Sequence, residues 1–577
     1  MELKPEPRPA VVRVNGPVVE AEGVEAAMLD FVEVGPKRLP GEVIALSGDR
    51  ATVQVYEYTG GLRPGDPILS SGGPLSAELG PGLLGGVFDG MLRRLTAAGD
   101  LLASGTRPGT LPSDRRWPFS PAAGVGDELA AAGLLGVVPE TETIEHRVLV
   151  PPGISGRVES IAPAGEYTVG EPVAIVGGHE LSLAQRWPVR QPRPFAARLP
   201  TEPPIRTGQR VLDLFYPVAR GSSAGVPGGF GTGKTVLLQQ IAKWCDADVI
   251  VYVGCGERGN EMADVLGELP RLEDPRTGRS LLERTVLIAN VSNMPVMARE
   301  ASIHTGVTVA EYYRDMGHDV VLIADSTSRW AEALREVASR TDELPAEEGY
   351  PAGLASALAS FYERAGRVRM PGGTEGSVTI VGAVSPPGGD LAEPVSAHTR
   401  RFVRCVWSLD RDLAYARHYP AVSWRDSSSR DAEAVGSWHA LEGDWAWRER
   451  RTAALRLLAE ADRIESVAQL VGAGSLPDDE RVVLVTARLL REAVLQQSSL
   501  SENDAYCAPE KQAALLQLVL DLHERCLELV RSGVTAEAIE EVDLSDAIRA
   551  PDETRPDDAA EVDGVRRRLL ARLGALR

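Results

Sequence analysis

Long hydrophobic runs are absent from this sequence of 577 residues. No apolar stretch approaches the ~20 residues that a membrane-spanning helix needs, so we expect no transmembrane segment. The chain starts with early proline and glutamate and without an apolar stretch of signal-peptide length, as MELKPEPRPAVVRVNG shows. We therefore expect no signal peptide and no export.

Basic residues are fewer than acidic residues. The chain has 61 lysines and arginines against 82 aspartates and glutamates, which gives a formal net charge of −21. A surface that repels phosphate gains little from counterion release, so broad binding of nucleic acid is not expected. This balance leaves room for a local basic pocket.

Cysteine is scarce and unpatterned. The five cysteines are odd in number, widely spaced and without a CxxC motif: Cys245, Cys255, Cys405, Cys507 and Cys526. This usage predicts reduced thiols in a cytosolic protein and no zinc site. Most of them are expected to be small buried hydrophobic residues.

The length predicts about three to five domains rather than one core. The hydrophobic fraction of 43% and mean hydropathy of −0.11 are those of an ordinary soluble globular protein. Turn signals, composition and periodicity divide the chain into five predicted parts, which are a β-barrel at 1–75, a Gly/Leu-rich linker at 76–114, an inserted β-rich domain at 115–190, a P-loop α/β domain at 191–434 and a helical domain at 435–577.

Two of these parts have clear periodicity. Short apolar runs alternate with helical stretches in the central part, which predicts βαβ units and a mainly parallel sheet. The predicted strands are 223–227, 247–254, 285–289, 319–324 and 377–383. Near the C-terminus, apolar residues recur at three and four positions, which predicts a helix of a bundle; they are Leu515, Leu518, Leu522, Cys526 and Leu529.

A glycine-rich stretch follows the first central strand. It reads GGFGTGKT and matches GxxxxGK[ST], and a helix-like VLLQQIAKW comes next. Such a loop points its backbone N–H groups at phosphate, and the helix N-terminus adds positive potential. Lys234 suits the β and γ phosphates, and the Thr235 hydroxyl suits Mg²⁺. The predicted phosphate loop comprises Gly228, Gly229, Phe230, Gly231, Thr232, Gly233, Lys234 and Thr235.

Two acidic positions complete a candidate hydrolase site. Asp325 ends the strand HDVVLIAD, as a Walker B acid does, and would hold Mg²⁺ through its water shell. Glu257 lies on a glycine-flanked loop, GCGERGNE, after another strand, where a carboxylate can orient and deprotonate water. Arg258 suits an ion pair with Glu257 or a phosphate contact. The spacing alone fits a surface Glu–Arg pair equally well.

At these residues the sequence resembles the catalytic A subunit of V/A-type rotary ATPases. The resemblance rests on long motifs that occur in order: GGFGTGKT, GCGERGNEM, LLERTVLIANVSNMPVMAREASIHTG, LIADSTSRWAEALRE and GAVSPPGGD. It extends from VNGPVV near the start to DAYCAPEKQ near the end. The inserted block at about 115–190 is typical of this family, whereas the F-type β subunit lacks it.

The resemblance implies a role for each matching residue. Glu257 falls on the glutamate that activates the attacking water, and Arg258 on the arginine beside it. Asp325 falls on the Walker B acid, and Arg329 on an arginine that contacts phosphate. Tyr419, in RHYPAV, falls on the aromatic residue that stacks against adenine.

Three positions depart from the family pattern. Gly229 stands where a proline is usual, and the change should loosen the loop at little cost. Thr232 stands where eukaryotic relatives carry a redox-sensitive cysteine, so that switch should be missing. Leu500 stands where an aromatic residue walls the adenine pocket, so nucleotide affinity or base selectivity should be lower.

The implied function is interconversion of ATP plus water with ADP plus phosphate, with Mg²⁺ as cofactor. The implied partners are a non-catalytic B subunit that alternates with this chain and supplies an arginine finger, central and peripheral stalks, and a membrane sector that moves H⁺ or Na⁺. The chain would lie on the cytoplasmic side of that membrane and bind no nucleic acid. The alternatives are a homohexameric translocase for protein or nucleic acid, and a subunit that only holds nucleotide.

Overall fold

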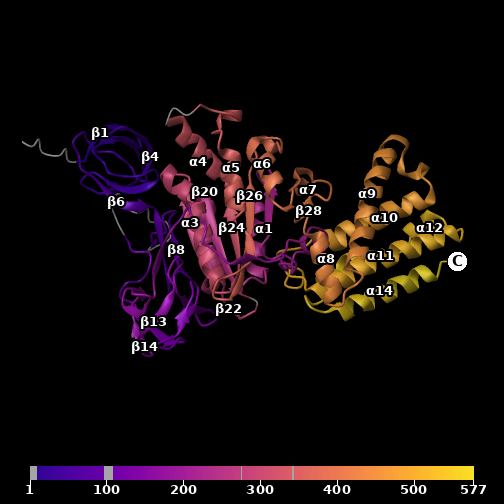
Figure 1. Ribbon diagram of the computed structural model, residues 1–577. Coiled ribbons are helices and arrows are strands. Elements are labelled where there is room, and N and C mark those ends of the chain that lie inside the picture. Colours follow the sequence, from indigo (N-terminus) through magenta and orange to yellow (C-terminus); the bar gives the residue numbers. More distant parts are fainter. Residues whose placement is uncertain (1–8, 96–107, 275, 341–343, 577) are drawn as a thin grey trace, which may run out of the picture. The chain divides into compact units, whose positions relative to one another are not determined.

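The computed structural model describes residues 9–95, 108–274, 276–340 and 344–576 (Figure 1). The predicted linker therefore lies partly outside the described residues, at 96–107, as do residues 1–8 of the predicted barrel. The chain forms two compact units. Unit 1 comprises Met1–Leu199, Ala247–Val384 and Ala397–Phe402, and unit 2 comprises Pro200–Asp246, Ser385–Ser396 and Val403–Arg577. The five-part division of the chain stays a prediction.

Unit 1 begins with an antiparallel β-sheet that has a buried apolar core. Its strands follow the order β1 (Ala10–Asn15), β2 (Val18–Glu22), β5 (Arg50–Val55), β4 (Leu39–Ser47), β3 (Asp30–Val34) and β6 (Ile68–Pro74). Valines from β2, β3, β4 and β5 form its buried core. The β structure predicted for this segment is confirmed.

The next part of unit 1 consists of two small antiparallel sheets, which agrees with the β-rich character predicted for this part. The Pro-Gly and Ala-Gly turns, which predict hairpins, instead connect strands of different sheets. One contains β10 (Glu128–Leu129), β13 (Gly156–Ile161), β15 (Pro172–Val176) and β16 (His179–Ser182). The other contains β12 (Glu145–Leu149), β11 (Leu134–Pro139), β9 (Trp117–Pro121) and β14 (Gly165–Tyr167).

The segment predicted as a linker contributes strands of its own. β7 (Ser76–Leu79) pairs antiparallel with β17 (Gln185–Pro188), and β8 (Val87–Phe88) pairs parallel with β23 (Thr285–Val291). These short strands have no hydrophobic alternation long enough to identify them. They form because partners more than 100 residues away in the sequence offer free strand edges.

The main sheet of unit 1 is parallel, in the order β26 (Glu375–Val384), β24 (Asp319–Asp325), β20 (Val249–Glu257), β23 and β8. β25 (Gly366–Arg369) extends it antiparallel and pairs with β18 (Ala197–Arg198). The long strands are buried nearly throughout, so each is a continuous apolar run. The connecting helices are α2 (Gly259–Glu268), α3 (Val296–Asp315), α4 (Thr327–Arg340) and α5 (Leu354–Tyr362). α3 packs along β20 and β24 (Figure 1).

A buried polar cluster joins the inserted sheets to α3. The carboxylate of Glu140 accepts hydrogen bonds from backbone N–H groups, from a tyrosine and from a histidine, at 2.7–3.0 Å; these are Gly82 N, Leu84 N, Tyr313 Oη and His146 Nδ1. His146 Nε2 lies 2.9 Å from Tyr312 Oη. Burial opposes ionisation of Glu140, but the bonds from His146 and the two N–H groups hold its pKa below the ordinary value.

We expect Glu140→Gln to destabilise this junction by about 1–3 kcal/mol at neutral pH, because buried donors lose a charged acceptor. Since the folded pKa of Glu140 is depressed, its contribution is present above the unfolded pKa and disappears as the pH falls through the folded value. Urea unfolding at pH 7 and pH 4 should therefore show a variant deficit that shrinks at pH 4. Glu142→Gln, at an exposed side chain two residues away, is the matched control. A deficit independent of pH would contradict the prediction.

Two further short strands of unit 1, β21 (Glu273–Asp274) and β22 (Arg279–Ser280), pair antiparallel with each other. In unit 2, β19 (Ser223–Pro227) is parallel to β27 (Cys405–Val406), and β27 is antiparallel to β28 (Ser428–Ser429). α1 (Lys234–Trp244) follows β19, and α7 (Arg411–Tyr415) follows β27. α6 (Pro394–Phe402) starts in unit 2 and ends in unit 1.

The C-terminal part of unit 2 is helical in the described residues. Its helices are α8 (Ala432–Leu441), α9 (Trp447–Val471), α10 (Asp478–Leu490), α11 (Pro509–Arg531), α12 (Ala536–Glu540), α13 (Ser545–Glu553) and α14 (Ala559–Gly574). The predicted apolar stripe of α11 is buried against α10 and α14, which confirms the helical prediction. Within the described residues, no helix has the length and apolar character to cross a membrane.

Candidate active site

The glycine-rich loop of unit 2 has the geometry of a phosphate cradle. It connects the fully buried strand β19 to α1, whose N-cap is Gly233. Gly233 has φ 85°, a left-handed conformation that glycine adopts without strain. The Lys234 ammonium donates to the carbonyls of Gly228 and Gly229, the latter at 3.1 Å, so it lies over the loop. The Thr235 hydroxyl is in the first turn of α1, beside the positive end of the helix.

The departure at Gly229 is sterically neutral. A Cβ there would meet only Gly389 Cα, at 3.8 Å, which is ordinary van der Waals contact. At Gly228, in contrast, a Cβ would come within 2.8 Å of both Leu409 and Thr232, so glycine is required by packing. Thr232 is buried, and its hydroxyl donates to Gly229 O at 2.9 Å.

Three residues of unit 2 that are predicted to bind the nucleotide have solvent-exposed apolar or aromatic side chains. The side chain of Phe230 is 83% exposed, that of Tyr419 is 42% exposed, and that of Leu500 is 95% exposed. Tyr419 is adjacent to the loop, because its ring lies 3.4 Å from the position of a Cβ on Gly233. Leu500 belongs to the segment 496–508, and Gln497 N in that segment donates to Tyr419 O at 2.8 Å. The structure thus brings Tyr419 to the phosphate loop within one unit.

Unit 1 brings the two predicted carboxylates to the ends of neighbouring strands. Asp325 ends β24 and pairs in register with Gly254 of β20, three residues before Glu257. The ladder between β20 and β23 shifts at Gly256, which directs Glu257 out of the regular alternation. Gly256 has φ 73°, and a Cβ there would lie 2.8 Å from Arg329 Cβ and 2.9 Å from Arg299 Cδ. This close packing requires glycine.

The surroundings of Glu257 disfavour its ionised form. The pKa of Glu257 is raised to about 7 by its partial burial, by the charge of Asp325 and by the neighbouring Glu261. The charge of Arg329 acts to lower this pKa. Asp325 is 4% exposed and accepts a hydrogen bond of 3.1 Å from Tyr252 Oη. Burial and the nearby Asp325 charge raise the pKa of Tyr252 well above its ordinary value, so this phenol stays a donor. A carboxyl group with a pKa near neutral is suited to general base catalysis.

The two predicted arginines differ in their surroundings. Arg329, in α4, pairs with Glu332 at 2.9 Å and is partly exposed. Arg258 is exposed, and its backbone forms the N-cap of α2 directly after Glu257.

Four family profiles match the chain in the order of its parts. They are the ATP synthase alpha/beta family β-barrel domain at residues 11–72, the ATP synthase alpha/beta subunit barrel-sandwich domain at 109–190, the ATP synthase alpha/beta family nucleotide-binding domain at 208–429 and the C-terminal domain of V and A type ATP synthase at 438–539.

Whole-chain relatives agree with these profiles. The A subunit of the A-type ATP synthase of Methanopyrus kandleri is 52% identical over 550 residues, which cover 93% of each chain. This chain belongs to the A-subunit family of A-type and V-type ATP synthases. The V-type ATP synthase alpha chain of Halothermothrix orenii is 50% identical over 92% of each chain. The resemblance identified from the sequence and the predicted fold class are both confirmed.

A solved structure outside the A-subunit family shares the fold. The assembled ATPase EscN from the type III secretion system of enteropathogenic E. coli superposes with a TM-score of 0.64 at 23% identity, over 89% of this chain and all of that chain. At this identity the likeness concerns the fold alone.

Several residues of this candidate site were missed by sequence reasoning. Tyr252 is one, although a single phenol within the apolar strand VIVYVG could have indicated a buried hydrogen-bond partner for the site. Glu261 is another, and its position four residues after Glu257 on α2 was available. Arg299 gave no signal, because it comes from α3 and reaches Gly256 only through tertiary packing.

Proposed function

We propose that this chain is the catalytic subunit of a rotary ATPase, which interconverts ATP plus water with ADP plus phosphate and couples this to H⁺ or Na⁺ transport. The observation that carries the proposal is the pair Glu257 and Asp325 at the ends of adjacent parallel strands, in a chain that also has an intact phosphate loop. A subunit that only holds nucleotide has no need of a carboxylate with a near-neutral pKa.

The phosphate loop would bind the nucleotide through its backbone. Glycines 228, 229, 231 and 233 leave room for the phosphates, and Lys234 would contact the β and γ phosphates. Arg329 and Arg258 would add positive charge near the transferred group. Tyr419 would stack on adenine, with Leu500 and Phe230 as apolar neighbours of the nucleotide.

Glu257 would act as general base. Its carboxylate would orient a water and accept its proton as the water attacks the γ phosphate. In the synthesis direction the same group would return the proton, by microscopic reversibility.

We propose Mg²⁺ as the cofactor, because both predicted ligand groups supply oxygen donors. Mg²⁺ prefers hard oxygen ligands and keeps several waters, and the Thr235 hydroxyl and the Asp325 carboxylate, through water, are such donors. The hydrogen bond from Tyr252 orients Asp325 without supplying positive charge. Bound there, the ion would neutralise charge on the phosphate oxygens.

Membership of the family supports a complex with other subunits. The subunits of ATP synthases act in complexes, and we propose a hexamer in which B subunits alternate with copies of this chain and contribute an arginine finger. Central and peripheral stalks would connect the hexamer to a membrane sector, on the cytoplasmic side of the membrane.

The native mass and composition of the complex purified from the source cells test this proposal. A mixed hexamer that contains a second subunit of similar size together with stalk proteins would support it. A ring of this chain alone, with export partners or nucleic acid attached, would instead favour the translocase alternative.

We expect Leu500→Phe to tighten nucleotide binding about 2- to 10-fold, because an added aromatic pair contributes roughly 0.5–1.5 kcal/mol beyond area burial. The measurement is titration with a fluorescent adenine nucleotide, repeated with a guanine nucleotide for selectivity. Leu470→Phe, at another highly exposed leucine of unit 2, is the matched control. Unchanged affinity and selectivity in Leu500→Phe would count against a role for this position in base binding.

A further inference from the structure

The segment 496–508 of unit 2, between η7 (Arg491–Leu495) and α11, presents an exposed tip on a rigid base. Its residues 498–500 are exposed, whereas Gln497 and Asp504 are buried. This segment, called here the 496–508 loop, carries Leu500 and is bonded to the main chain of Tyr419. Its conformation therefore determines where Leu500 lies relative to Tyr419.

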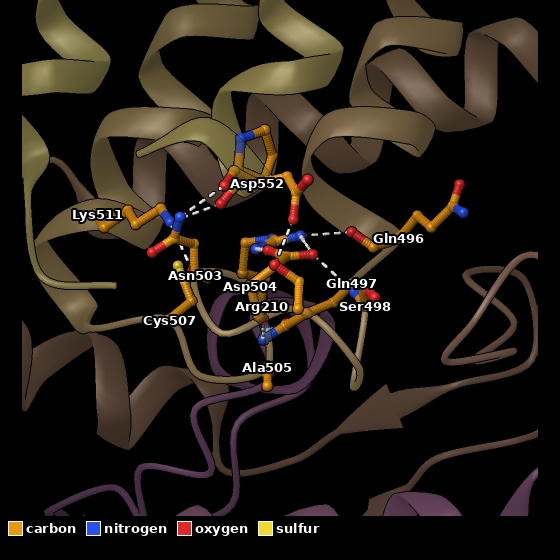
Figure 2. A network of polar contacts seen from close by, with 12 residues as sticks. Arg210, Gln496, Gln497, Ser498, Asn503, Asp504, Ala505, Cys507, Lys511 and Asp552 are labelled. Carbon is orange, nitrogen blue, oxygen red and sulfur yellow. Dashed lines mark hydrogen bonds and ion pairs between the residues drawn. The ribbon is translucent and has the colours of Figure 1, made fainter. Parts of the chain in front are cut away.

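The base of the 496–508 loop is held by Arg210, whose side chain is fully buried (Figure 2). The guanidinium donates to Val494 O at 3.0 Å and also bonds to Gln496 O and the Asp504 carboxylate. The Gln497 side chain accepts from Arg210 N and donates to Asp504 O, both at 2.8 Å. Satisfied buried networks of this kind allow little movement.

The outer half of the same loop is bonded to the C-terminal helices (Figure 2). Lys511 of α11 donates to Asn503 O at 3.0 Å and to Pro551 O of α13 at 2.7 Å. Asn503 Nδ2 donates to Asp552 O at 2.9 Å. The hydroxyl of Ser501, one residue after Leu500, donates to the Asp552 carboxylate.

The Ser501–Asp552 hydrogen bond differs from the rest of this network. Its acceptor is the exposed side chain of Asp552 on α13. Its donor, Ser501, is the residue directly after Leu500, so the bond connects α13 to the loop next to Leu500. Ser501 is half-buried and Asp552 is exposed, so breaking this bond leaves no fully buried polar side chain without a partner. Its evident effect is to restrain the tip, and a tip restrained before binding loses less entropy when a ligand docks.

We propose that Asp552 is a positioning residue for adenine recognition, acting through Ser501 to hold Leu500 beside the base. This inference rests on the proposed function. It implies that α13, at the far end of the sequence, contributes to nucleotide affinity, and by linkage that bound adenine stabilises the position of α13 against the 496–508 loop.

The test compares the full chain with Asp552→Ala, Ser501→Ala and the double variant. We measure the binding of a fluorescent ADP analogue and, by competition, of pyrophosphate, which lacks the base. Either single variant should weaken ADP binding about 2- to 10-fold, as expected for one lost hydrogen bond. The double variant should match the single variants, because both remove the same bond. Pyrophosphate binding should not change.

Glu553→Ala is the matched control, since this neighbouring exposed acid pairs with Arg549 at 3.4 Å, within its own helix. Equal weakening of ADP and pyrophosphate would overturn the inference by showing a general structural effect. Wild-type ADP binding in both Asp552→Ala and Ser501→Ala would also overturn it. If the wild-type chain bound neither ADP nor pyrophosphate, both the proposed function and the role of Asp552 would be wrong. Failure of the role of Asp552 alone would instead leave wild-type ligand binding intact, so the two failures are distinguishable.

Discussion

Replacing Glu257 with glutamine is expected to lower ATP hydrolysis by the complex about 10²- to 10⁴-fold, the usual contribution of a positioned general base. Glutamine has nearly the same shape but cannot accept a proton from the attacking water. Nucleotide binding should persist, because the phosphate loop is unaltered. In the wild type, burial and the nearby Asp325 and Glu261 disfavour the ionised form of Glu257. The neutral amide of glutamine removes this unfavourable charge.

Single-turnover hydrolysis and binding of a fluorescent ATP analogue separate the two effects for Glu257→Gln. Glu268→Gln, at an exposed glutamate at the end of α2, is the matched control and should be fully active. Full activity of Glu257→Gln would remove Glu257 from its role. Loss of nucleotide binding together with hydrolysis would mean that Glu257 maintains the site rather than acts in the reaction.

We expect the isolated chain to hydrolyse ATP about 10³- to 10⁵-fold more slowly than the proposed hexamer, because arginine fingers supplied in trans have effects of this size in phosphoryl transfer. The chain's own Arg329 is engaged with Glu332 at 2.9 Å and interacts with the acids of its own unit, so it is a poor substitute for an arginine from a neighbour. The slow step in the isolated chain would be the chemistry, since binding needs only the phosphate loop.

Steady-state hydrolysis at saturating MgATP, for the chain alone and after reconstitution with its partner subunit, checks this expectation. Reconstitution with a partner subunit that lacks the finger arginine is the control and should restore assembly without the rate. A chain that turns over alone at the rate of the complex would contradict the prediction and favour a ring built from this chain only.

The local features of the site could be predicted because they depend on contiguous residues. A phosphate loop is one strand, one turn and one helix start, so GGFGTGKT contains all the information that its backbone needs. The strands of the parallel sheet were predictable for a similar reason, since strands buried on both faces are continuous apolar runs. Helix α11 follows from its own apolar stripe.

The electrostatics of the site depend on long-range packing. The pKa of Glu257 reflects its burial and the charge of Asp325, which is far away in the sequence and adjacent only because β20 and β24 pair in parallel. Tyr252 lies on β20 but bonds to Asp325 of β24, and Arg299 comes from α3. Strands β7 and β8 also depend on long-range packing, because they form only by pairing with strands that are distant in the sequence.

The sequence alone was sufficient to identify the family and to predict the order of the parts, the phosphate loop and the two carboxylates, because each of these is a pattern of neighbouring residues with its own local physics. The tertiary structure decided that Glu257 titrates near neutrality, that Gly229 is sterically free while Gly228 is not, and that Arg210 and Asp552 hold the loop carrying Leu500. Charges and hydrogen bonds act through distance in space, and the chain brings residues 210, 504 and 552 together only when it folds.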